Sequence, residues 1–276
     1  KGEKTSEMST SVAIIIPCHN HGEYVGEAVA SALAQTLPAS EIIVIDDASD
    51  EPARRTCEAL ASGRVRVIRN EKNLGLSASR NRAIREAGSE AILPLDADDK
   101  LHPDFLRHAL PVLESSPDVG WVYTDCTLFG SRDGFLEFPD YDLTLLLAHD
   151  VCLAPSLFRR RDWERVGGYD ESFAIGQEDW DFWVSLAEKG LRGAHVSQRL
   201  YDYRQHSASM RSRSHKDIDV SAEKMWNKHK DFYERHAEAI WRYYVGRFYG
   251  GRPDAFRSES KISLLRRIAR KLGLRT

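Results

Sequence analysis

The chain carries an acidic strand end in the stretch Ala91-Ile92-Leu93-Pro94-Leu95-Asp96-Ala97-Asp98-Asp99, where an apolar run is followed by three carboxylates within four residues. The pattern predicts a buried strand with acidic groups at its carboxyl end, where open α/β sheets hold their ligands. Because side chains alternate along an extended chain, Asp96 and Asp98 could face one ligand while Asp99 turns away or reaches a neighbouring group. Such hard oxygen ligands suit Mg²⁺ or Mn²⁺. The alternative is a solvated acidic turn that caps a helix near Pro103.

The composition fits a globular chain. It has 276 residues, 42% of them hydrophobic, and a formal net charge of -3, so no overall basic field favours a nucleic-acid partner. No apolar run approaches the roughly 18 to 20 residues of a membrane-spanning helix. The cysteines are scattered without a C-x-x-C pair, which fits neither a disulfide framework nor a zinc site. We therefore expect a cytoplasmic protein.

Strand and helix patterns alternate over the first half of the chain. Continuous apolar or β-branched runs predict strands covered on both faces, and apolar positions at helical spacing separate them. The predicted strands are 12–16, 42–45, 65–68 and 91–95, and the predicted helices are 23–35, 54–61, 77–87 and 103–113. This alternation predicts an α/β fold with a right-handed, mostly parallel sheet flanked by helices.

A second acidic cluster, Asp46-Asp47, follows the predicted strand at 42–45. Because parallel strands end at the same edge of a sheet, we expect both acidic clusters at one edge. The chain has neither the Gly-x-Gly-x-x-Gly of a dinucleotide fold nor the Gly-Lys-Ser/Thr of a phosphate loop. A nucleotide would therefore be held by side chains and metal.

The second half of the chain is less regular. After a strand at 119–124, residues 128–142 are aromatic and contain glycine, which predicts an irregular loop lining an acceptor cleft. A helical face begins after Gln177, so Glu178 and Asp179 lie at a helix N-terminus. Capping of that helix is the alternative to a catalytic role for this pair.

The sequence pattern of the last part of the chain predicts one mobile segment and two helical segments. The Ser- and Arg-rich residues 205–214 suit closure over an anionic ligand. A helical pattern spans 220–249, and residues 263–271 form a basic amphipathic pattern that predicts either an interfacial helix or an ordinary packed one. We divide the chain into a disordered tail at 1–10, a main domain at 11–218 and a helical C-terminal extension at 219–276.

Taken together, these residues resemble the family-2 inverting glycosyltransferases of the GT-A fold over roughly residues 11–211. Four elements occur in that family's order. They are Ile15-Ile16-Pro17-Cys18-His19-Asn20, Ile45-Asp46-Asp47-Ala48-Ser49, Asn73-Leu74-Gly75-Leu76-Ser77-Ala78-Ser79-Arg80-Asn81 with Leu95-Asp96-Ala97-Asp98-Asp99, and Gly167-Gly168-Tyr169-Asp170-Glu171 followed by Glu178-Asp179-Trp180-Asp181. The resemblance implies a Rossmann-like sheet of the GT-A type.

The resemblance also implies a nucleotide site. It assigns nucleotide binding to Pro17, His19, Asn20, Asp46, Asp47, Arg80, Asp96, Ala97 and Asp98. In the family pattern, Asp46 matches the carboxylate that receives the uracil imide hydrogen, and Asp96 lies near the ribose. Asp98 matches the holder of the metal that bridges the diphosphate. Asp96, Asp99 and His206 are further candidate metal ligands, and Arg211 is a candidate donor-loop residue.

For the reaction itself, the resemblance assigns the base to Asp179, with Glu178 beside it. One carboxylate near the acceptor hydroxyl takes its proton as the oxygen attacks the anomeric carbon, while metal and cations stabilise the departing diphosphate. A single displacement inverts the anomeric centre.

The resulting hypothesis is a hexosyltransferase that uses Mn²⁺ or Mg²⁺ and a nucleotide-diphosphate sugar, most simply a UDP-sugar. Its acceptor would be a carbohydrate or lipid-linked hydroxyl in bacterial glycan or polysaccharide biosynthesis. The basic tail would allow peripheral contact with the inner face of the membrane. Two alternatives remain: a haloacid-type phosphohydrolase, although Asp99 stands where Thr or Val is common in that class, and a non-catalytic nucleotide-sugar-binding partner of a glycan-assembly complex.

Overall fold

The computed structural model describes residues 10–152, 155–173, 176–206 and 218–249. The chain divides into one compact unit up to Lys230 and a second from Asp231 onward. Helix α9 (Ile218–Lys228) belongs to the first unit, although the sequence analysis assigned it to the helical extension. Arg211 and the basic tail at 263–271 lie outside the described residues.

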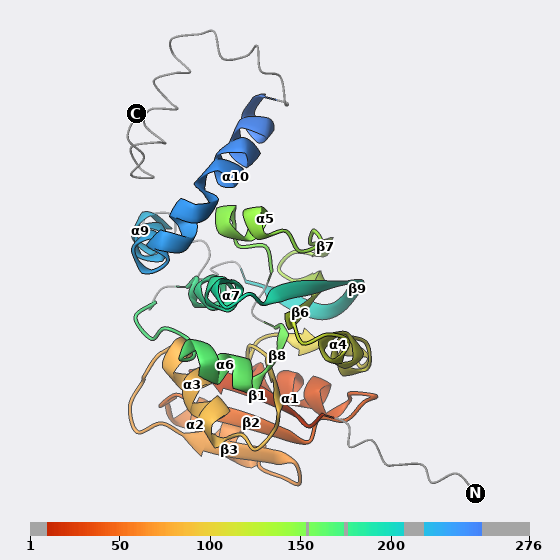
Figure 1. The fold of residues 1–276 in the computed structure, drawn as a ribbon. Coiled ribbons are helices and arrows are strands. Elements are labelled where there is room, and N and C mark those ends of the chain that lie inside the picture. Colours follow the sequence, from red (N-terminus) through yellow and green to blue (C-terminus); the bar gives the residue numbers. More distant parts are fainter. Residues whose placement is uncertain (1–9, 153–154, 174–175, 207–217, 250–276) are drawn as a thin grey trace, which may run out of the picture. The chain divides into compact units, whose positions relative to one another are not determined.

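The first half of the chain alternates strands and helices as its pattern predicts. The strands are β1 (Val12–Cys18), β2 (Glu41–Asp46), β3 (Val65–Arg69), β4 (Ala91–Pro94) and β5 (Lys100–Leu101), and the helices are α1 (Val25–Leu33), α2 (Glu51–Ala59), α3 (Leu76–Glu86) and α4 (Phe105–Glu114). Helices α1, α2 and α3 lie against the first strands, as Figure 1 shows. Both faces of these strands are therefore covered, which explains why β1 is buried along its whole length.

The second half supplies β6 (Val119–Gly130), β7 (Gly134–Leu136), α5 (Leu143–Ala148), β8 (Leu157–Arg159), α6 (Arg160–Val166), α7 (Glu178–Glu188) and β9 (Arg192–Gln205). The strand order of the sheet is β3-β2-β1-β4-β8-β6-β9-β5, with β7 on β6. Strands β3, β2, β1 and β4 are parallel neighbours, as are β6 and β9, whereas β8, β5 and β7 pair antiparallel. The predicted α/β class is confirmed, and the sheet is mixed in its second half.

Two segments are more regular than their sequence pattern suggests. Residues 128–142, predicted as an irregular loop, contain the end of β6 and the hairpin partner β7. Strand β9 runs for 14 residues from Arg192, in a part of the chain where no strand is predicted above. The pairing of β9 with β6 shifts register at three places, which breaks the alternation that reveals a strand in a sequence.

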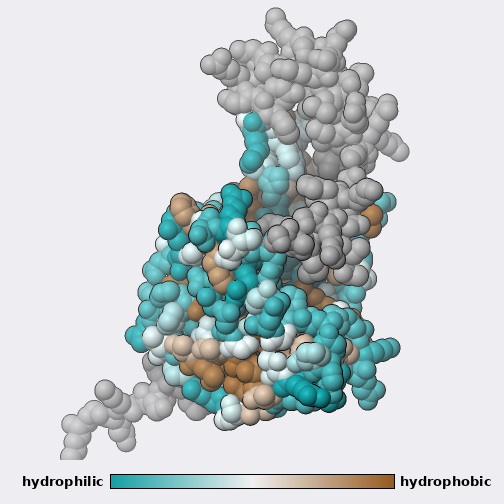
Figure 2. Space-filling view, turned by 180° about the vertical axis from the view of Figure 1, so that it is seen from behind, coloured by the Kyte–Doolittle hydropathy of each residue, from teal (hydrophilic) through white to brown (hydrophobic). Residues whose placement is uncertain are grey.

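The surface and the helices add three further observations. All four cysteines are free and buried. No helix within the described ranges is both long enough and apolar enough to cross a bilayer. Seen from behind, the surface is mostly hydrophilic with an apolar area in the lower part of the view, as Figure 2 shows. The exposed large apolar side chains are Leu33, Leu74, Phe135 and Val220, from separate segments of the chain.

Candidate functional site

The carboxyl ends of β2, β1 and β4 meet at one edge of the sheet. In the register, Cys18 at the end of β1 is the partner of Asp46, and Pro94 at the end of β4 is the partner of Ile15. Both acidic clusters therefore leave the same edge of the sheet, from the two strands that flank β1, as the sequence predicts. Among the described residues, three non-glycine residues have positive φ: Asn20 (58°) after β1, Ala48 (55°) after β2 and Gln177 (68°) directly before α7. Conformations of this kind cost about 1 to 3 kcal/mol each and cluster at functional sites.

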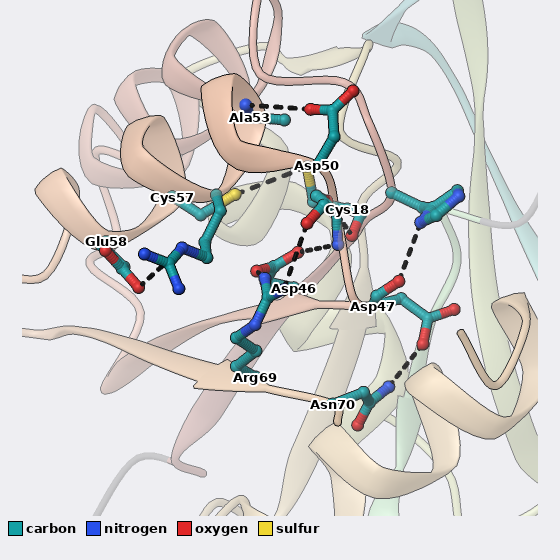
Figure 3. A network of polar contacts seen from close by, with 12 residues as sticks. Cys18, Asp46, Asp47, Asp50, Ala53, Cys57, Glu58, Arg69 and Asn70 are labelled. Atoms are coloured by element: carbon teal, nitrogen blue, oxygen red, sulfur yellow. Dashed lines mark hydrogen bonds and ion pairs between the residues drawn. The ribbon is translucent and has the colours of Figure 1, made fainter. Parts of the chain in front are cut away.

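Asp46 is buried, and both of its oxygens are engaged. Its Oδ1 accepts a hydrogen bond from the backbone N–H of Ser49 at 2.9 Å, and its Oδ2 forms an ion pair with Arg69. Figure 3 shows Arg69 reaching Asp46 from β3, where the two residues are register partners. Arg69 was not among the predicted site residues, although the parallel register of β2 and β3 could have indicated it. A nucleobase N–H directed at Asp46 would share this carboxylate with Arg69.

Asp47 orders the loop that precedes α3. Its Oδ1 accepts from Leu74 N at 2.8 Å and from Asn70 Nδ2 at 2.7 Å, and its Oδ2 accepts from Gly75 N at 2.9 Å. The backbone oxygen of Asp47 lies 2.8 Å from His19 Nδ1. The side chain predicted to bind nucleotide is thus occupied by the protein, and it holds the first-strand turn and the loop at 70–75 together.

The turn after β1 is tied to the turn after β2. Pro17 lies inside β1, and Asn20 joins the two turns through its backbone and side chain. Asn20 N donates to Ser49 Oγ at 3.0 Å, and Asn20 Oδ1 accepts from Asp50 N at 2.8 Å. The predicted first-strand element is therefore tied to the turn that follows Asp46.

Arg80 is fully buried and joins the two halves of the site. Its Nη2 donates to Asp96 Oδ1 and its Nη1 to Glu178 Oε1, both at 2.7 Å, and its guanidinium lies 5.6 Å from the ring centroid of Tyr169. Burial alone would lower the pKa of Arg80, but the carboxylates of Asp96 and Glu178 raise it overall. Arg80 is therefore a fixed cation, and Glu178 is bound to it rather than capping α7.

Asp98 lies in a small group of potential metal donors. His206 Nε2 is 2.8 Å from Asp98 Oδ2, and His21 Nδ1 is 3.9 Å from the same oxygen. The intervening Ala97 is buried. Among the described residues, no three His, Cys, Asp or Glu side chains are arranged as a ready metal site. Asp98 and His206 would supply a partial ligand set, which fits ions such as Mg²⁺ that keep water and substrate phosphates in their coordination sphere.

Asp99 turns into the protein. Its Oδ1 accepts from Arg204 N at 2.7 Å, and its Oδ2 accepts from the hydroxyl of Tyr201. Burial, followed by the charges of Asp98 and Asp96, raises the pKa of Asp99 to about 9. Arg204 Nε also donates to the backbone oxygen of Asp98 at 2.7 Å. This geometry favours a structural role for Asp99, which fixes the acidic turn to β9, over the predicted share in metal binding.

Asp179 lies in the first turn of α7 and is half-buried. Its Oδ1 accepts from Trp180 N at 2.9 Å. Burial, with the nearby carboxylates of Asp150 and Glu178, raises its pKa well above the ordinary value, and Arg80 opposes this rise. The residue before the helix, Gln177, makes no side-chain cap. A carboxylate whose pKa is raised is a stronger base than an ordinary carboxylate.

Asn81 holds the glycine turn that leads toward α7. Its Oδ1 accepts from Tyr169 N at 2.9 Å and from Trp163 Nε1 at 3.1 Å, and its Nδ2 donates to Tyr169 O at 2.8 Å. Adjacent residues of α3, Arg80 and Asn81, thus fix both motifs of the second half. The sequence analysis quoted Asn81 within a motif but assigned it no role.

Gly168→Ala is expected to destabilise the protein more than Gly167→Ala. Both glycines have positive φ, 84° and 87°, so alanine is strained at either position. A Cβ on Gly168 would also lie 2.8 Å from Asn81 Oδ1 and 3.0 Å from the Trp163 ring, whereas one on Gly167 meets nothing within 4 Å. We expect an additional loss of about 1 to 3 kcal/mol in urea unfolding for Gly168→Ala. Equal losses in the two variants would contradict this interpretation.

Comparison with known protein sequences gives consistent matches. A family model described as Glycosyl transferase family 2 matches residues 13–163. The succinoglycan biosynthesis protein ExoU of Rhizobium meliloti is 41% identical over 242 residues, covering 78% of this chain and 68% of ExoU. The chondroitin synthase of Escherichia coli is 31% identical over 219 residues, covering 77% of this chain. The matched region spans only 31% of that synthase, less than a third of its length.

Solved structures are similar in fold. S. aureus TarS 1–349 in complex with UDP-GlcNAc gives a TM-score of 0.63 at 18% identity, covering 73% of this chain and 60% of that one. The mannosyltransferase PcManGT from Pyrobaculum calidifontis, in complex with GDP-Man and Mn²⁺, gives a TM-score of 0.59 at 21% identity, covering 75% and 60%. At these identities the likeness concerns the fold alone.

Proposed function

The chain belongs to glycosyl transferase family 2 and has the GT-A type of α/β fold, and from this premise we propose that it is a metal-dependent, inverting hexosyltransferase that uses a UDP-sugar. One observation carries the proposal: the buried Arg80 binds both Asp96 of the acidic strand end and Glu178 beside Asp179. A donor-side carboxylate and the candidate base are thereby held in one site.

The donor end of the site supports a nucleotide-diphosphate sugar. Asp46, at the end of β2, would share its carboxylate between Arg69 and the imide hydrogen of uracil, and this would discriminate against bases without a donor at that position. The similar structures contain UDP-GlcNAc in one case and GDP-Man in another. Guanine N1–H is also a donor, so Asp46 by itself would select against adenine and cytosine, and the choice between uridine and guanosine is open to direct test.

Asp98 and His206 would hold the divalent cation, which when bound neutralises charge on the departing diphosphate. Their side chains are 20% and 28% exposed, so the pair is accessible to a ligand. Arg204 and Asp99 keep the turn that carries Asp98 in place through β9. Asp96, bound to Arg80, would lie on the ribose side of this turn.

Asp179 would act at the acceptor. As the acceptor oxygen attacks the anomeric carbon, Asp179 takes the proton of the hydroxyl, and the bond from that carbon to the diphosphate oxygen breaks. Because attack and departure occur on opposite faces in one displacement, the anomeric configuration is inverted. Glu178 takes no part as a base, since Arg80 engages its carboxylate.

The rate of transfer is expected to rise with pH through the pKa of Asp179. Burial and the neighbouring carboxylates raise that pKa, and only the ionised carboxylate can accept a proton. Activity should therefore be lost on acidification at a higher pH than for an ordinary carboxyl group. A profile of log kcat against pH measures this, and a flat profile over the range in which the protein stays folded would count against the base assignment.

The relatives suggest the biological setting. The names of ExoU and the chondroitin synthase refer to polysaccharide synthesis, and we propose that this chain acts in bacterial polysaccharide biosynthesis on a carbohydrate or lipid-linked acceptor. We also propose that it is cytoplasmic and that the basic tail, outside the described residues, contacts an anionic membrane surface. Deleting residues 260–276 should then reduce co-sedimentation with anionic liposomes. Unchanged co-sedimentation would contradict the proposed membrane contact and would leave the proposed reaction unaffected.

The reaction class is tested by incubating the protein with Mn²⁺ and a panel of UDP-sugars, with and without candidate acceptors. We expect UDP release that is abolished by a chelator, and a glycoside product whose anomeric configuration, read by NMR, is opposite to that of the donor. Release of phosphate from simple monoesters would instead support the phosphohydrolase alternative. Donor binding without hydrolysis or transfer would support a non-catalytic binding partner.

A further inference from the structure

The first turn of α7 is held from several sides. Glu178 is bound by Arg80 of α3, and Trp180 Nε1 donates to the backbone oxygen of Leu146 in α5 at 2.6 Å. Asp181, one residue further, is bound by Lys228, the last residue of α9, and by His229, which follows it. The side chains around Asp179 thus attach the first turn of α7 to three helices, α3, α5 and α9. Of these contacts, the one with α9 is not indicated by any of the sequence motifs.

Asp181 is a completely buried carboxylate with two basic partners. His229 Nε2 lies 2.9 Å from its Oδ1, and Lys228 Nζ lies 2.7 Å from its Oδ2. An isolated buried carboxylate is strongly unfavourable, so its presence here depends on these partners. The contact between α7 and the end of α9 therefore consists of ion pairs.

Lys228 and His229 also contact residues other than Asp181. Lys228 Nζ also lies 3.0 Å from Asp170 Oδ2, in the glycine turn before α7. His229 Nδ1 lies 3.3 Å from Oε2 of Glu188, at the last turn of α7. Lys228 therefore connects the two acceptor-side motifs, and His229 contacts α7 near both of its ends.

The direction of this contact matters for Asp179. Residues of a helix are separated by about 100°, so positions two apart lie roughly 200° apart and project to nearly opposite sides. Asp181 faces α9 while Asp179 projects away from it. By binding Asp181, Lys228 and His229 therefore fix the rotation of α7 about its axis, and with it the direction in which Asp179 projects.

We propose that Lys228 and His229 are positioning residues for the transfer reaction, which hold α7 through Asp181 so that Asp179 meets the acceptor hydroxyl. This inference rests on the proposed function for its catalytic consequence. The pair lies beyond residues 13–163, which the family model matches. Within the described ranges, the ion pairs of Lys228 and His229 go to Asp170, Asp181 and Glu188 and to none of the donor-side carboxylates. Their effect should therefore fall on the chemical step rather than on donor binding.

The test uses the full chain with the variants Lys228→Met, Lys228→Arg and His229→Leu. Lys189→Met, at an exposed position directly after α7, and His108→Leu, on α4, are the matched controls. Two readouts are taken: hydrogen exchange of the α7 amides, and kcat and KM for the UDP-sugar. Hydrogen exchange needs no turnover, so it separates failure of this inference from failure of the proposed function.

We expect Lys228→Met and His229→Leu to speed exchange in α7 and to lower kcat roughly 10- to 100-fold, with KM for the donor within about twofold of wild type. Lys228→Arg should retain most of the rate, and the controls should behave as wild type. If Lys228→Met does not fold, the double variant Asp181→Asn/Lys228→Met removes both charges and takes its place. Unchanged α7 exchange, an unchanged kcat or an equal loss in Lys189→Met would overturn the proposal. If the wild-type protein turns over no donor, the proposed function fails, and α7 exchange alone decides whether the pair holds the helix.

Discussion

Replacing Asp179 by Asn is expected to lower the rate of transfer by roughly 10²- to 10⁴-fold, the usual contribution of a positioned general base. The amide has nearly the shape of the carboxylate but cannot accept the hydroxyl proton. Asp179 makes its described side-chain contact with the adjacent Trp180 N, so the substitution leaves the contacts of Glu178 and Asp181 intact. Affinity for UDP should therefore stay near that of the wild type.

Two comparisons make the Asp179→Asn result specific. Asp133→Asn changes an exposed carboxyl group between β6 and β7 and should leave the rate unchanged. The residual rate of Asp179→Asn should also lack the dependence on pH that the base confers. Single-turnover kinetics with a UDP-sugar measures both, and transfer at the wild-type rate would show that Asp179 is not the base.

Arg80→Met is expected to affect stability and activity together. The substitution keeps much of the volume but leaves Glu178, 7% exposed, and Asp96 facing each other without their shared cation. Breaking a buried ion pair from one side costs about 3 to 5 kcal/mol. We therefore expect a loss of this size in the free energy of unfolding, together with weaker donor binding and slower transfer, because both motifs lose their anchor.

Urea unfolding and UDP titration check this prediction. Arg85→Met, an exposed position on the same helix, is the matched control and should lie within about 0.5 kcal/mol of wild type. Adding Glu178→Gln to Arg80→Met should recover part of the stability, since it removes one uncompensated charge. A stable Arg80→Met protein with normal kinetics would mean that the bridge is dispensable.

The sequence predicted the edge of the sheet well because that edge follows from local patterns. The apolar runs before Asp46 and Asp96 indicate parallel strands, and parallel strands deliver their ends to one side. The helix that begins at Glu178 also follows from spacing alone. The strands and helices that form these features are recognised from the local spacing of apolar residues, which the sequence records directly.

The roles of individual carboxylates could not be predicted in the same way. Asp46, Asp47, Asp96 and Asp99 look alike in the sequence, yet they bind Arg69, the loop at 70–75, Arg80 and β9 respectively. Their partners come from other strands, a helix or a loop, and the pairing depends on register and rotamers. Strand β9, whose register shifts hide its alternation, supplies both Tyr201 and Arg204 to Asp99.

The most direct measurement of the central claim is calorimetric titration of the protein with UDP and with GDP, each with Mn²⁺ and with a chelator. We predict that UDP binds in the presence of Mn²⁺, that the chelator abolishes or strongly weakens this binding, and that GDP binds less tightly. Tighter binding of GDP would indicate a GDP-sugar as the donor and would leave the proposed transfer reaction unchanged. Binding of neither nucleotide, with or without metal, would contradict the assignment of this chain as a nucleotide-sugar transferase.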